Sequence, residues 1–540
     1  MSETKAESPL SAPEDDQDEV TEAVCLESDL KEGQMMEVEV GGHTLLLTRT
    51  EGKYSALENQ CTHYGAPLSK GVISGTHVRC PWHGSCFNTH TGDVEEFPGM
   101  DSLPCHKTIR QGKRIKHMGG AEPGNSRTAL LIGGGATSLS CAETLRQENY
   151  SGRIIMVSRD YLLPYDKTRL SKVMNVQSES ILLRGMEFYQ KYDIEVWLKK
   201  EAKCLDTEAK TVTFDDGTVQ SYDHLLISTG CRAKVLDVPG MDLKNVLMLE
   251  TPEDARQIHA VCEGTRVVLV GTSFVGMEVA SYMLNKASDI TVIGSSDIPY
   301  QNTLGKEIGK ITLQMLAEKG VKFHMNEFVT EIRGANGTVN SHITVRLYKS
   351  RRLKMFVCFQ LKDVVLKSGA VIPADVLIVG IGVNPNSELL RGTDVRLDHK
   401  RFVVVDKFMK TTVPDVFCGG DVCTFPLTIA EDQQVNIGHW QMAQAHGKVV
   451  ALNMLGRATQ LNSVPYYWTV QLGRTIRYAG FGEGYTEIII KGKVEDRKFL
   501  GLYIKDERVV AAVSLNFDPA VSAVAERLLS GPVITKMEAQ

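Results

Sequence analysis

Two cysteines and two histidines lie in two short motifs that could hold a metal centre. The first motif is Cys61-Thr-His63, and the second is Cys80-Pro-Trp-His83. Thiolate and imidazole groups at such short spacing can reach one centre from a single loop. Zinc fingers usually place two cysteines in one half of the site, whereas here each motif offers one Cys and one His. The sequence therefore predicts a metal centre that two loops build together.

This equal division favours an iron–sulfur cluster over zinc. In a Rieske [2Fe–2S] cluster, two cysteines bind one iron and two histidines bind the other. Cys61 and Cys80 are therefore expected on one iron, and His63 and His83 on the other. Gly65 and Gly84 follow the two motifs, and glycine permits the tight turns that would close the loops. A mononuclear zinc site stays open as the alternative.

Length and composition indicate an ordinary multidomain globular chain. Its 540 residues correspond to about three to four domains, and 42% are hydrophobic and 23% charged. The net charge of −6 gives no reason to expect a nucleic-acid surface. No apolar run approaches the ~20 residues that span a bilayer. The 12 cysteines are too few in so long a chain for a disulfide framework, so a reducing compartment is expected.

The first 22 residues are acidic and polar. They contain eight acidic residues and one Lys, so they cannot bury enough apolar surface to order themselves. The segment is unlike an Arg-rich mitochondrial presequence and has no signal-peptide core. These features favour the cytoplasm, with the mitochondrion as the alternative location.

Short β-runs separated by turns follow from residue 23 to residue 118. Gly41-Gly42 is the expected hairpin turn between the first two runs. The two Cys/His loops lie in the same segment, so we expect a small all-β domain that carries the cluster. A glycine-rich linker at 119–127 separates this domain from the rest of the chain.

A first dinucleotide-binding unit begins at Thr128–Ile132, an apolar strand. The turn Gly133–Ser138 follows, then a helix, then the strand Arg153–Val157, and then Asp160. The glycines let the backbone approach a pyrophosphate at the helix N-terminus, and the acid receives ribose hydroxyls. Ser138 stands where the third glycine of the fingerprint is usual, and we expect its small side chain to be tolerated.

A second unit begins at the strand Arg266–Val270 and continues through Gly271 to Gly276. Ser273 replaces the middle glycine, and Gly294 stands where an acid would hold the ribose of NAD. Gly271, Gly276 and the downstream Gly382 are the candidate NAD(P)-binding residues. The alternative is a unit that keeps its fold and binds nicotinamide poorly.

The remaining segments complete the two units and add a last domain. Residues 340–361 fit no element, and they are either an added hairpin or a segment wrongly included in the protein.

Pro414–Asp421 is a strand that ends in a glycine turn and an Asp, and the helix after it carries Trp440. The glycine turn and Asp421 are suited to holding the ribityl chain and pyrophosphate side of a flavin. From residue 458 a sheet followed by a helix predicts an α+β domain. The last domain either covers that flavin or forms a subunit interface, so a homodimer stays open.

Four motifs resemble those of the pyridine-nucleotide-disulfide-reductase superfamily, in its apoptosis-inducing-factor and ferredoxin-reductase branch. They are the first glycine fingerprint, Pro164-Tyr-Asp166 with Leu170-Ser-Lys172, Gly276-Met-Glu278, and Pro414–Asp421. With a Rieske domain in front, the chain resembles the Rieske-fused members of that family. The resemblance implies bound FAD and an ion pair of Lys172 with Glu278 beside the flavin. It implies FAD contacts from Gly133, Gly135, Asp160, Lys167, Lys172, Lys234, Asp421 and Trp440.

The predicted fold class is therefore multidomain. A Rieske domain (23–118) and a linker (119–127) precede two Rossmann-type domains, one for FAD (128–253 and 384–457) and one for NAD(P) (254–383), and an α+β domain (458–540) ends the chain. We expect an enzyme that passes electrons from NAD(P)H through FAD to the cluster and an unidentified acceptor. Because the cofactors carry this chemistry, no side-chain acid or base is expected. The alternative is an apoptosis or redox-signalling regulator with weak or absent NAD(P)H oxidation.

Overall fold

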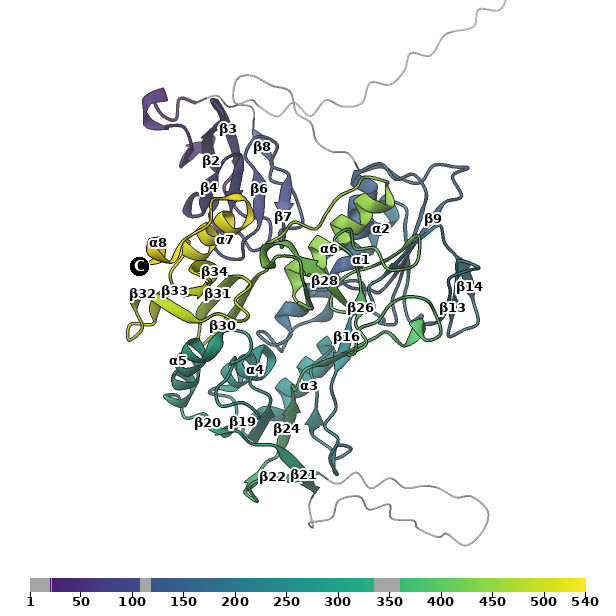
Figure 1. The fold of residues 1–540 in the computed structure, drawn as a ribbon, viewed down its shortest axis with the longest axis vertical. Helices are drawn as coiled ribbons and strands as arrows, with labels where there is room; N and C mark the ends of the chain where they lie inside the picture. The colour runs from purple at the N-terminus through teal and green to yellow at the C-terminus, as the bar shows by residue number, and fades with distance from the viewer. Residues whose placement is uncertain (1–19, 21, 107–117, 335–359) are drawn as a thin grey trace, which may run out of the picture.

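The computed structural model describes residues 20, 22–106, 118–334 and 360–540 (Figure 1). Most of the acidic tail and most of the 340–361 segment lie outside these ranges. Within them, no helix is both long enough and apolar enough to span a membrane.

The N-terminal β domain consists of two small antiparallel sheets. Val40 pairs with His43, so the predicted hairpin at Gly41-Gly42 is present. Leu46, Leu57, Val78 and Phe87 form its core. The strand orders are β1-β2-β3-β8 and β4-β5-β6-β7, with bounds β1 Gln34–Val40, β2 His43–Thr50, β3 Lys53–Glu58, β4 Val72–Ser74, β5 His77–Arg79, β6 Cys86–Asn88, β7 Val94–Glu96 and β8 Cys105–His106.

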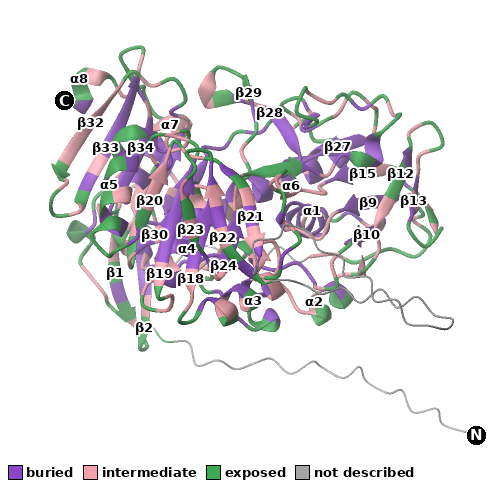
Figure 2. Cartoon of the chain, turned by 90° about the horizontal axis from the view of Figure 1, so that it is seen from below, coloured by how far each residue is buried: buried purple, intermediate pink, exposed green. Residues whose placement is uncertain are grey.

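The first nucleotide-binding unit is a parallel sheet of order β11-β10-β9-β15-β27. Its strands read as continuous apolar runs because both faces of the sheet are covered (Figure 2). Helix α1 packs against α6. The bounds are β9 Thr128–Ile132, α1 Ala136–Gln147, β10 Arg153–Val157, α2 Met186–Lys191, β11 Ile194–Trp197, β15 His224–Ile227, β27 Val416–Cys418 and α6 Trp440–Met454.

Smaller sheets flank this unit and connect it to the next. The first has the order β12-β13-β14, the second β26-β28-β29, and the crossover pair is β16-β25. Their bounds are β12 Ala202–Asp206, β13 Thr211–Phe214, β14 Val219–Ser221, β16 Cys231–Ala233, β25 Val383–Pro385, β26 Val403–Val404, β28 Cys423–Leu427 and β29 Gln433–Val435.

The second nucleotide-binding unit is a parallel sheet of order β17-β24-β18-β19-β20, beside the antiparallel sheet β21-β22-β23. The bounds are β17 Val246–Leu247, α3 Pro252–Cys262, β18 Arg266–Val270, α4 Phe274–Met283, β19 Asp289–Gly294, α5 Gly305–Ala317, β20 Lys322–Met325, β21 Val329–Gly334, β22 Leu361–Leu366, β23 Val371–Pro373 and β24 Val376–Val379.

One predicted boundary differs from this topology. The sequence interpretation assigned everything up to residue 253 to the first unit. Strand β17 instead pairs in parallel with β24, with Val246 opposite Leu377. The chain therefore changes sheets between β16 and β17, because β17 supplies the edge strand of the second sheet.

The C-terminal domain is an antiparallel sheet of order β30-β31-β34-β33-β32 with helix α7 against it. In Figure 1, α7 lies between this sheet and the N-terminal β domain. The bounds are β30 Tyr466–Gln471, β31 Arg474–Gly480, β32 Glu487–Lys493, β33 Lys498–Lys505, β34 Arg508–Leu515, α7 Ala520–Ser530 and α8 Lys536–Ala539.

Candidate redox site

The two Cys/His loops are closed by their own backbone. In the first loop, the Gly65 amide donates to the Cys61 carbonyl oxygen at 2.8 Å. In the second, the Cys80 amide donates to the Ser85 carbonyl oxygen at 2.8 Å. Gly84 has φ +79°, and a Cβ there would lie 2.7 Å from the ring of Tyr466 in the C-terminal domain. Glycine is therefore required both by the turn and by the packing of the loop on its neighbour.

The four predicted ligand residues converge between these loops. The Nδ1 atoms of His63 and His83 lie 3.1 Å apart. A hydrogen bond from the Cys80 thiol lowers the pKa of Cys61 to about 7. Burial lowers the pKa of His63 to about 4 and that of His83 also, so both rings are neutral, the form that binds metals. Two buried sulfurs beside two neutral imidazoles fit the donor set of a Rieske cluster.

The histidine side of this centre faces the reductase part of the chain. The His83 ring lies 4.3 Å from the ring of Trp468 on β30, and the His63 ring lies 5.6 Å from it. The Tyr64 hydroxyl donates to Asp166 Oδ2 at 2.6 Å. Trp468 and Asp166 were missed as site residues because nothing in their local sequence pattern links them to residues some 100 to 400 positions earlier.

Helix α7 and strand β31 fasten the second cluster loop. Ser522 Oγ donates to the Cys80 carbonyl oxygen at 3.0 Å, and the Arg477 guanidinium donates to the Trp82 carbonyl oxygen. These bonds join the N-terminal β domain to the C-terminal domain at the loop that carries the predicted ligands Cys80 and His83, so the orientation of this loop is fixed relative to Trp468.

Lys172 and Glu278 form the expected ion pair at 2.9 Å. The carboxylate of Glu278 is 4% exposed and also accepts hydrogen bonds from Ser171 and, at 2.7 Å, from Thr469. Burial, and then the positive charge of Lys172, lower the pKa of His439 to about 3. The positive charge of Lys172 therefore acts on His439 at the start of α6 and on His83 in the second cluster loop, and its ammonium group is held by a carboxylate that Ser171 and Thr469 also bond.

The first glycine turn leaves room for a dinucleotide. A Cβ on Gly133 would lie 2.1 Å from the Ser228 carbonyl oxygen, whereas around Gly135 no described atom comes within 4 Å of such a Cβ. This open space at the N-terminus of α1 fits a phosphate group. Ser138 Oγ lies 2.7 Å from Ser228 Oγ, so the serine in place of the third glycine joins the helix to the residue that directly follows strand β15.

The other residues predicted to bind FAD differ in their burial and in their contacts. Asp160 follows β10, with its amide bonded to Ser158 Oγ at 3.1 Å. Burial raises the pKa of Asp421, and the positive charge of Lys167 acts on it in the opposite direction. Lys234 is exposed, and its amide donates to the Gly382 carbonyl oxygen at 2.9 Å.

Trp440 begins α6, but its neighbour His439 has the more informative contacts. The His439 ring lies 5.5 Å from Trp468. Its Nδ1 atom is buried and has no hydrogen-bond partner among the described residues. An unpaired buried nitrogen indicates a ligand group at this position, which fits a flavin ring.

The second glycine turn has glycine at two of the three fingerprint positions, Gly271 and Gly276, and the backbone leaves no room for a side chain at either. A Cβ on Gly271 would lie 2.0 Å from the Gly380 carbonyl oxygen, and one on Gly276 would lie 1.9 Å from that of Gly271. Ser273 is the exposed N-cap of α4. At Gly294, a Cβ would lie 2.6 Å from Thr272 and 2.8 Å from Met325 Cε, so these side chains fill the space that an acid would use.

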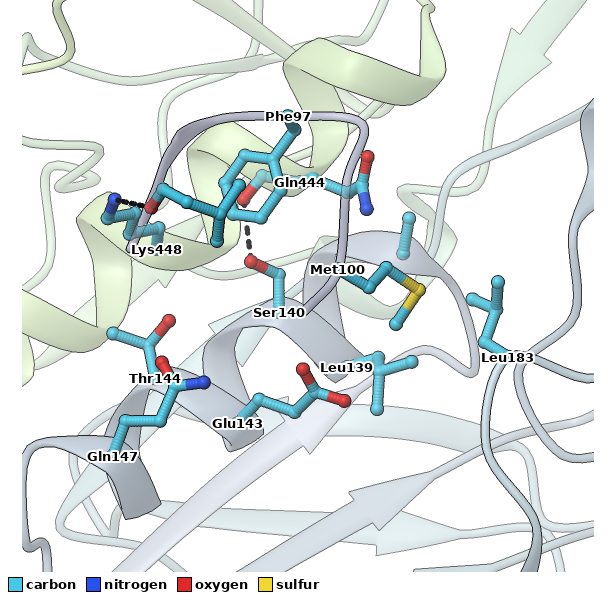
Figure 3. A pocket seen from close by; sticks show the side chains of 12 residues that line it. Phe97, Met100, Leu139, Ser140, Glu143, Thr144, Gln147, Leu183, Gln444 and Lys448 are labelled. Atoms are coloured by element: carbon cyan, nitrogen blue, oxygen red, sulfur yellow. Dashed lines mark hydrogen bonds between the residues drawn. The ribbon is translucent and has the colours of Figure 1, made fainter. Parts of the chain in front are cut away.

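A cavity of about 40 Å³ lies where the N-terminal β domain meets α1 and α6 (Figure 3). Phe97 and Met100 cover it from the β domain, and Ser140 on α1 donates to the Gln444 carbonyl oxygen at 2.8 Å beside it. This volume suits a few water molecules at most, so the cavity is a packing gap of the domain contact and no cofactor site.

Comparison with known families accounts for most of the chain. Residues 21–107 match the Rieske [2Fe-2S] domain, residues 127–447 match pyridine nucleotide-disulphide oxidoreductase, and residues 466–537 match the reductase C-terminal domain. Apoptosis-inducing factor 3 of Homo sapiens is 42% identical over 97% of this chain and 86% of its own length.

Reductase components of oxygenase systems are more distant relatives. The ferredoxin–NAD(+) reductase subunit of the benzene 1,2-dioxygenase system of Pseudomonas putida is 29% identical over 76% of this chain and 93% of its own. The crystal structure of the ferredoxin reductase for the CYP199A2 system of Rhodopseudomonas palustris has a TM-score of 0.69 at 25% identity, over 77% of this chain and 97% of its own.

These matches confirm the predicted fold class and enzyme class. FAD, NAD(P)H and a [2Fe–2S] cluster are the cofactors and co-substrate of this combination of domains. The chain belongs to the pyridine nucleotide-disulphide oxidoreductase family, as a flavin-dependent reductase that carries a Rieske [2Fe–2S] domain at its N-terminal end.

Proposed function

We propose that this protein is an NAD(P)H oxidoreductase that passes electrons from FAD to its own Rieske cluster, and from the cluster to an acceptor outside the chain. The observation that carries the proposal is the 4.3 Å contact between the rings of His83 and Trp468. His83 belongs to the proposed ligand set Cys61, His63, Cys80 and His83. Trp468 contacts His439 at the start of α6, where a flavin ring fits the unpaired Nδ1 atom.

Bound FAD would supply hydride acceptance and one-electron release, and the cluster would accept one electron at a time. The residues of the chain bind and orient these groups. We assign Gly133, Gly135, Asp160, Lys167 and Asp421 to the FAD phosphates and ribose, with Lys234 and Trp440 at the edge of the site. Lys172 would stabilise negative charge on the reduced flavin, and Glu278 holds its ammonium group in place.

Two features support transfer within one chain. The ferredoxin–NAD(+) reductase subunit of Pseudomonas putida matches over 76% of this chain and 93% of its own length, and residues 21–107 match a Rieske domain, so an iron–sulfur domain and a reductase of that kind are joined in one chain. The Rieske domain is also bonded to the C-terminal domain through Cys80 and Trp82. The external acceptor would then receive electrons from the cluster.

Anaerobic stopped-flow mixing with NADH and with NADPH tests this function. We expect flavin bleaching followed by loss of the oxidised-cluster absorbance, at a rate that does not depend on protein concentration. A matching Rieske-type EPR signal should disappear in Cys80→Ser and persist in Cys105→Ser, whose half-buried thiol lies outside the ligand set. Cluster reduction that never follows flavin bleaching would refute the proposal, and zinc without iron or sulfide would refute the cluster.

The packing around Gly294 favours a second candidate, a redox-signalling role with slow NAD(P)H oxidation. Thr272 and Met325 occupy the space of the ribose-binding acid, so nicotinamide binding through Gly271, Gly276 and Gly382 lacks that contact. The relatives named apoptosis-inducing factor 3 accord with such a role. This candidate predicts that FAD and iron copurify while neither nicotinamide bleaches the flavin within minutes; rapid bleaching by either would exclude it.

The homodimer and the cytoplasmic location stay predictions. Size-exclusion chromatography with light scattering would decide the first, and fractionation of cells that express the full chain would decide the second against the mitochondrial alternative.

A further inference from the structure

A row of aromatic rings leads away from the cluster site into the C-terminal domain. Trp468 stands at its inner end, in contact with His83. The His439 ring bridges Trp468, at 5.5 Å, and Tyr467, at 5.3 Å. Tyr467 then stacks on Tyr478 on the neighbouring strand, with ring centroids 4.5 Å apart and planes 13° apart.

The row continues to the protein surface. The Tyr478 ring lies 5.6 Å from that of Tyr503, and the Tyr503 ring lies 5.1 Å from that of Tyr485. Tyr485 is half-buried, and its hydroxyl donates a 2.7 Å hydrogen bond to Glu307, an exposed residue of α5. Every centroid separation in the row is therefore within the range of ordinary aromatic contacts.

The surrounding backbone is shaped to hold these rings. The Gly482 amide donates to the Tyr478 hydroxyl at 2.7 Å, and the Tyr503 hydroxyl donates to the Leu304 carbonyl oxygen at 2.6 Å. A Cβ on Gly305 would lie 2.3 Å from the Tyr485 hydroxyl oxygen, so the left-handed glycine there makes room for the ring. Trp468, Tyr478 and Tyr503 are at most 6% exposed.

Tryptophan and tyrosine share one redox property. Each can lose a single electron to a strong oxidant, and tyrosine loses its phenolic proton at the same time. Electrons from NAD(P)H do not reduce tryptophan or tyrosine rings, so this row of rings is not part of the route from NAD(P)H to the cluster. It suits the transfer of an oxidising equivalent, and the carboxylate of Glu307 is placed to take the proton of Tyr485 at the outer end.

We propose that Trp468, Tyr467, Tyr478, Tyr503 and Tyr485 form a route by which a one-electron oxidising equivalent leaves the redox site for the surface, where a small thiol quenches it. The activity is protective. It goes beyond the proposed electron relay and does not depend on which nicotinamide reduces the flavin.

The electrons and protons balance with an oxygen radical as oxidant and a thiol as reductant. A hydroxyl radical at the redox site takes one electron from Trp468 and becomes hydroxide. Electrons then move inward ring by ring, so the net loss is one electron from Tyr485, whose proton passes to Glu307. A thiol gives a hydrogen atom to the Tyr485 oxygen and becomes a thiyl radical, and Glu307 releases its proton to water.

Hydrogen peroxide together with a ferrous chelate, which gives one electron to the peroxide and so yields hydroxyl radical, hydroxide and the ferric chelate, is added to the purified holoenzyme to test the route, with freeze-quench EPR and peptide mass spectrometry as readouts. The wild type should show a tyrosine radical and few oxygen adducts on Trp468. Tyr478→Phe and Tyr485→Phe keep the ring packing and remove an oxidisable phenol. Both should increase the adducts on Trp468 several-fold, and Tyr478→Phe should also lower oxidation at Tyr485.

Tyr161→Phe is the matched control, because Tyr161 is 45% exposed, hydrogen-bonds Glu253, and lies outside the row. Its adducts on Trp468 should equal those of the wild type. Flavin content and thermal midpoint, measured for every variant, exclude misfolding as the cause. Equal oxidation of Trp468 in the wild type and in both row variants would overturn the proposal, as would an equal increase in Tyr161→Phe.

Discussion

Arg79 and Glu526 form a buried ion pair although 447 positions separate them in the sequence. The Arg79 guanidinium, which is fully buried, also contacts Glu96 at 2.7 Å. One cation of the Rieske domain thus lies between a carboxylate of its own sheet and one of helix α7. Removing one member of a buried ionic group leaves its partners charged and unpaired.

Replacement of Arg79 by leucine should therefore destabilise the contact between the domains. We expect a loss of about 3–5 kcal/mol, seen as a lower thermal midpoint of the first unfolding transition. Arg333→Leu removes the solvent-exposed partner of Glu331 and should leave the midpoint almost unchanged, because exposed ion pairs contribute little to stability. Equal midpoints in the two variants would contradict the stabilising role of Arg79.

Lys172→Met should make the reduction potential of the bound flavin more negative. The lost positive charge no longer stabilises the anionic reduced flavin, so its reduction potential becomes more negative. We expect reduction by NADH to slow about tenfold, which corresponds to about 1.4 kcal/mol. Potentiometric titration and stopped-flow absorbance measure both effects. Lys362→Met, at an exposed position of β22, should change neither; an unaltered potential in Lys172→Met would rule out the charge effect.

The nicotinamide site should improve when its middle glycine is restored. In Ser273→Gly the backbone at the start of α4 can approach the pyrophosphate, so we expect about tenfold tighter NADH binding, or about 1.4 kcal/mol. Anaerobic titration of the flavin absorbance measures this affinity.

Gly294→Glu alone should not tighten NADH binding, because the added Cβ meets Thr272 and Met325. Gly294→Glu combined with Met325→Ala should tighten it. Unchanged affinity in Ser273→Gly would show that the serine is no obstacle.

His77 should make stability depend on pH. Its Nε2 atom lies 2.7 Å from Glu95, and this hydrogen bond raises the pKa of His77 in the folded protein. The contribution is fully present below the unfolded pKa of about 6.5 and is lost as pH rises through the folded value. The thermal midpoint of His77→Gln should therefore lie below that of the wild type at about pH 6. At about pH 9 the two midpoints should be equal. The exposed His43→Gln should show no such difference; a constant gap for His77→Gln would count against the ion pair.

The regular elements could be predicted from sequence where burial is uniform. Thr128–Ile132, Arg153–Val157 and Arg266–Val270 were predicted as strands and have those bounds in the structure. Parallel strands covered on both faces read as unbroken apolar runs, which local patterns identify. The Cys61 and Cys80 motifs were equally visible, because all their ligand atoms come from two short loops.

Long-range relationships could not be predicted in this way. Trp468 reads as an ordinary strand residue, and only the folded chain brings its ring to His83. The two-residue strand β17 has no pattern of its own, since its sheet is set by pairing with β24. The Lys172–Glu278 pair was predicted from family resemblance, because two residues 106 positions apart share no local pattern.

The bonds from Ser522 and Arg477 to the second cluster loop have a consequence for how electron exchange responds to its surroundings. When a separate ferredoxin meets its reductase, charges steer the encounter and added salt slows it. Here the Rieske domain is already bonded to the reductase part of the chain, so no encounter between two proteins has to precede electron transfer. The rate of electron transfer to the cluster should thus be insensitive to ionic strength. A soluble iron–sulfur protein added in excess should not displace the Rieske domain from its contact with Trp468.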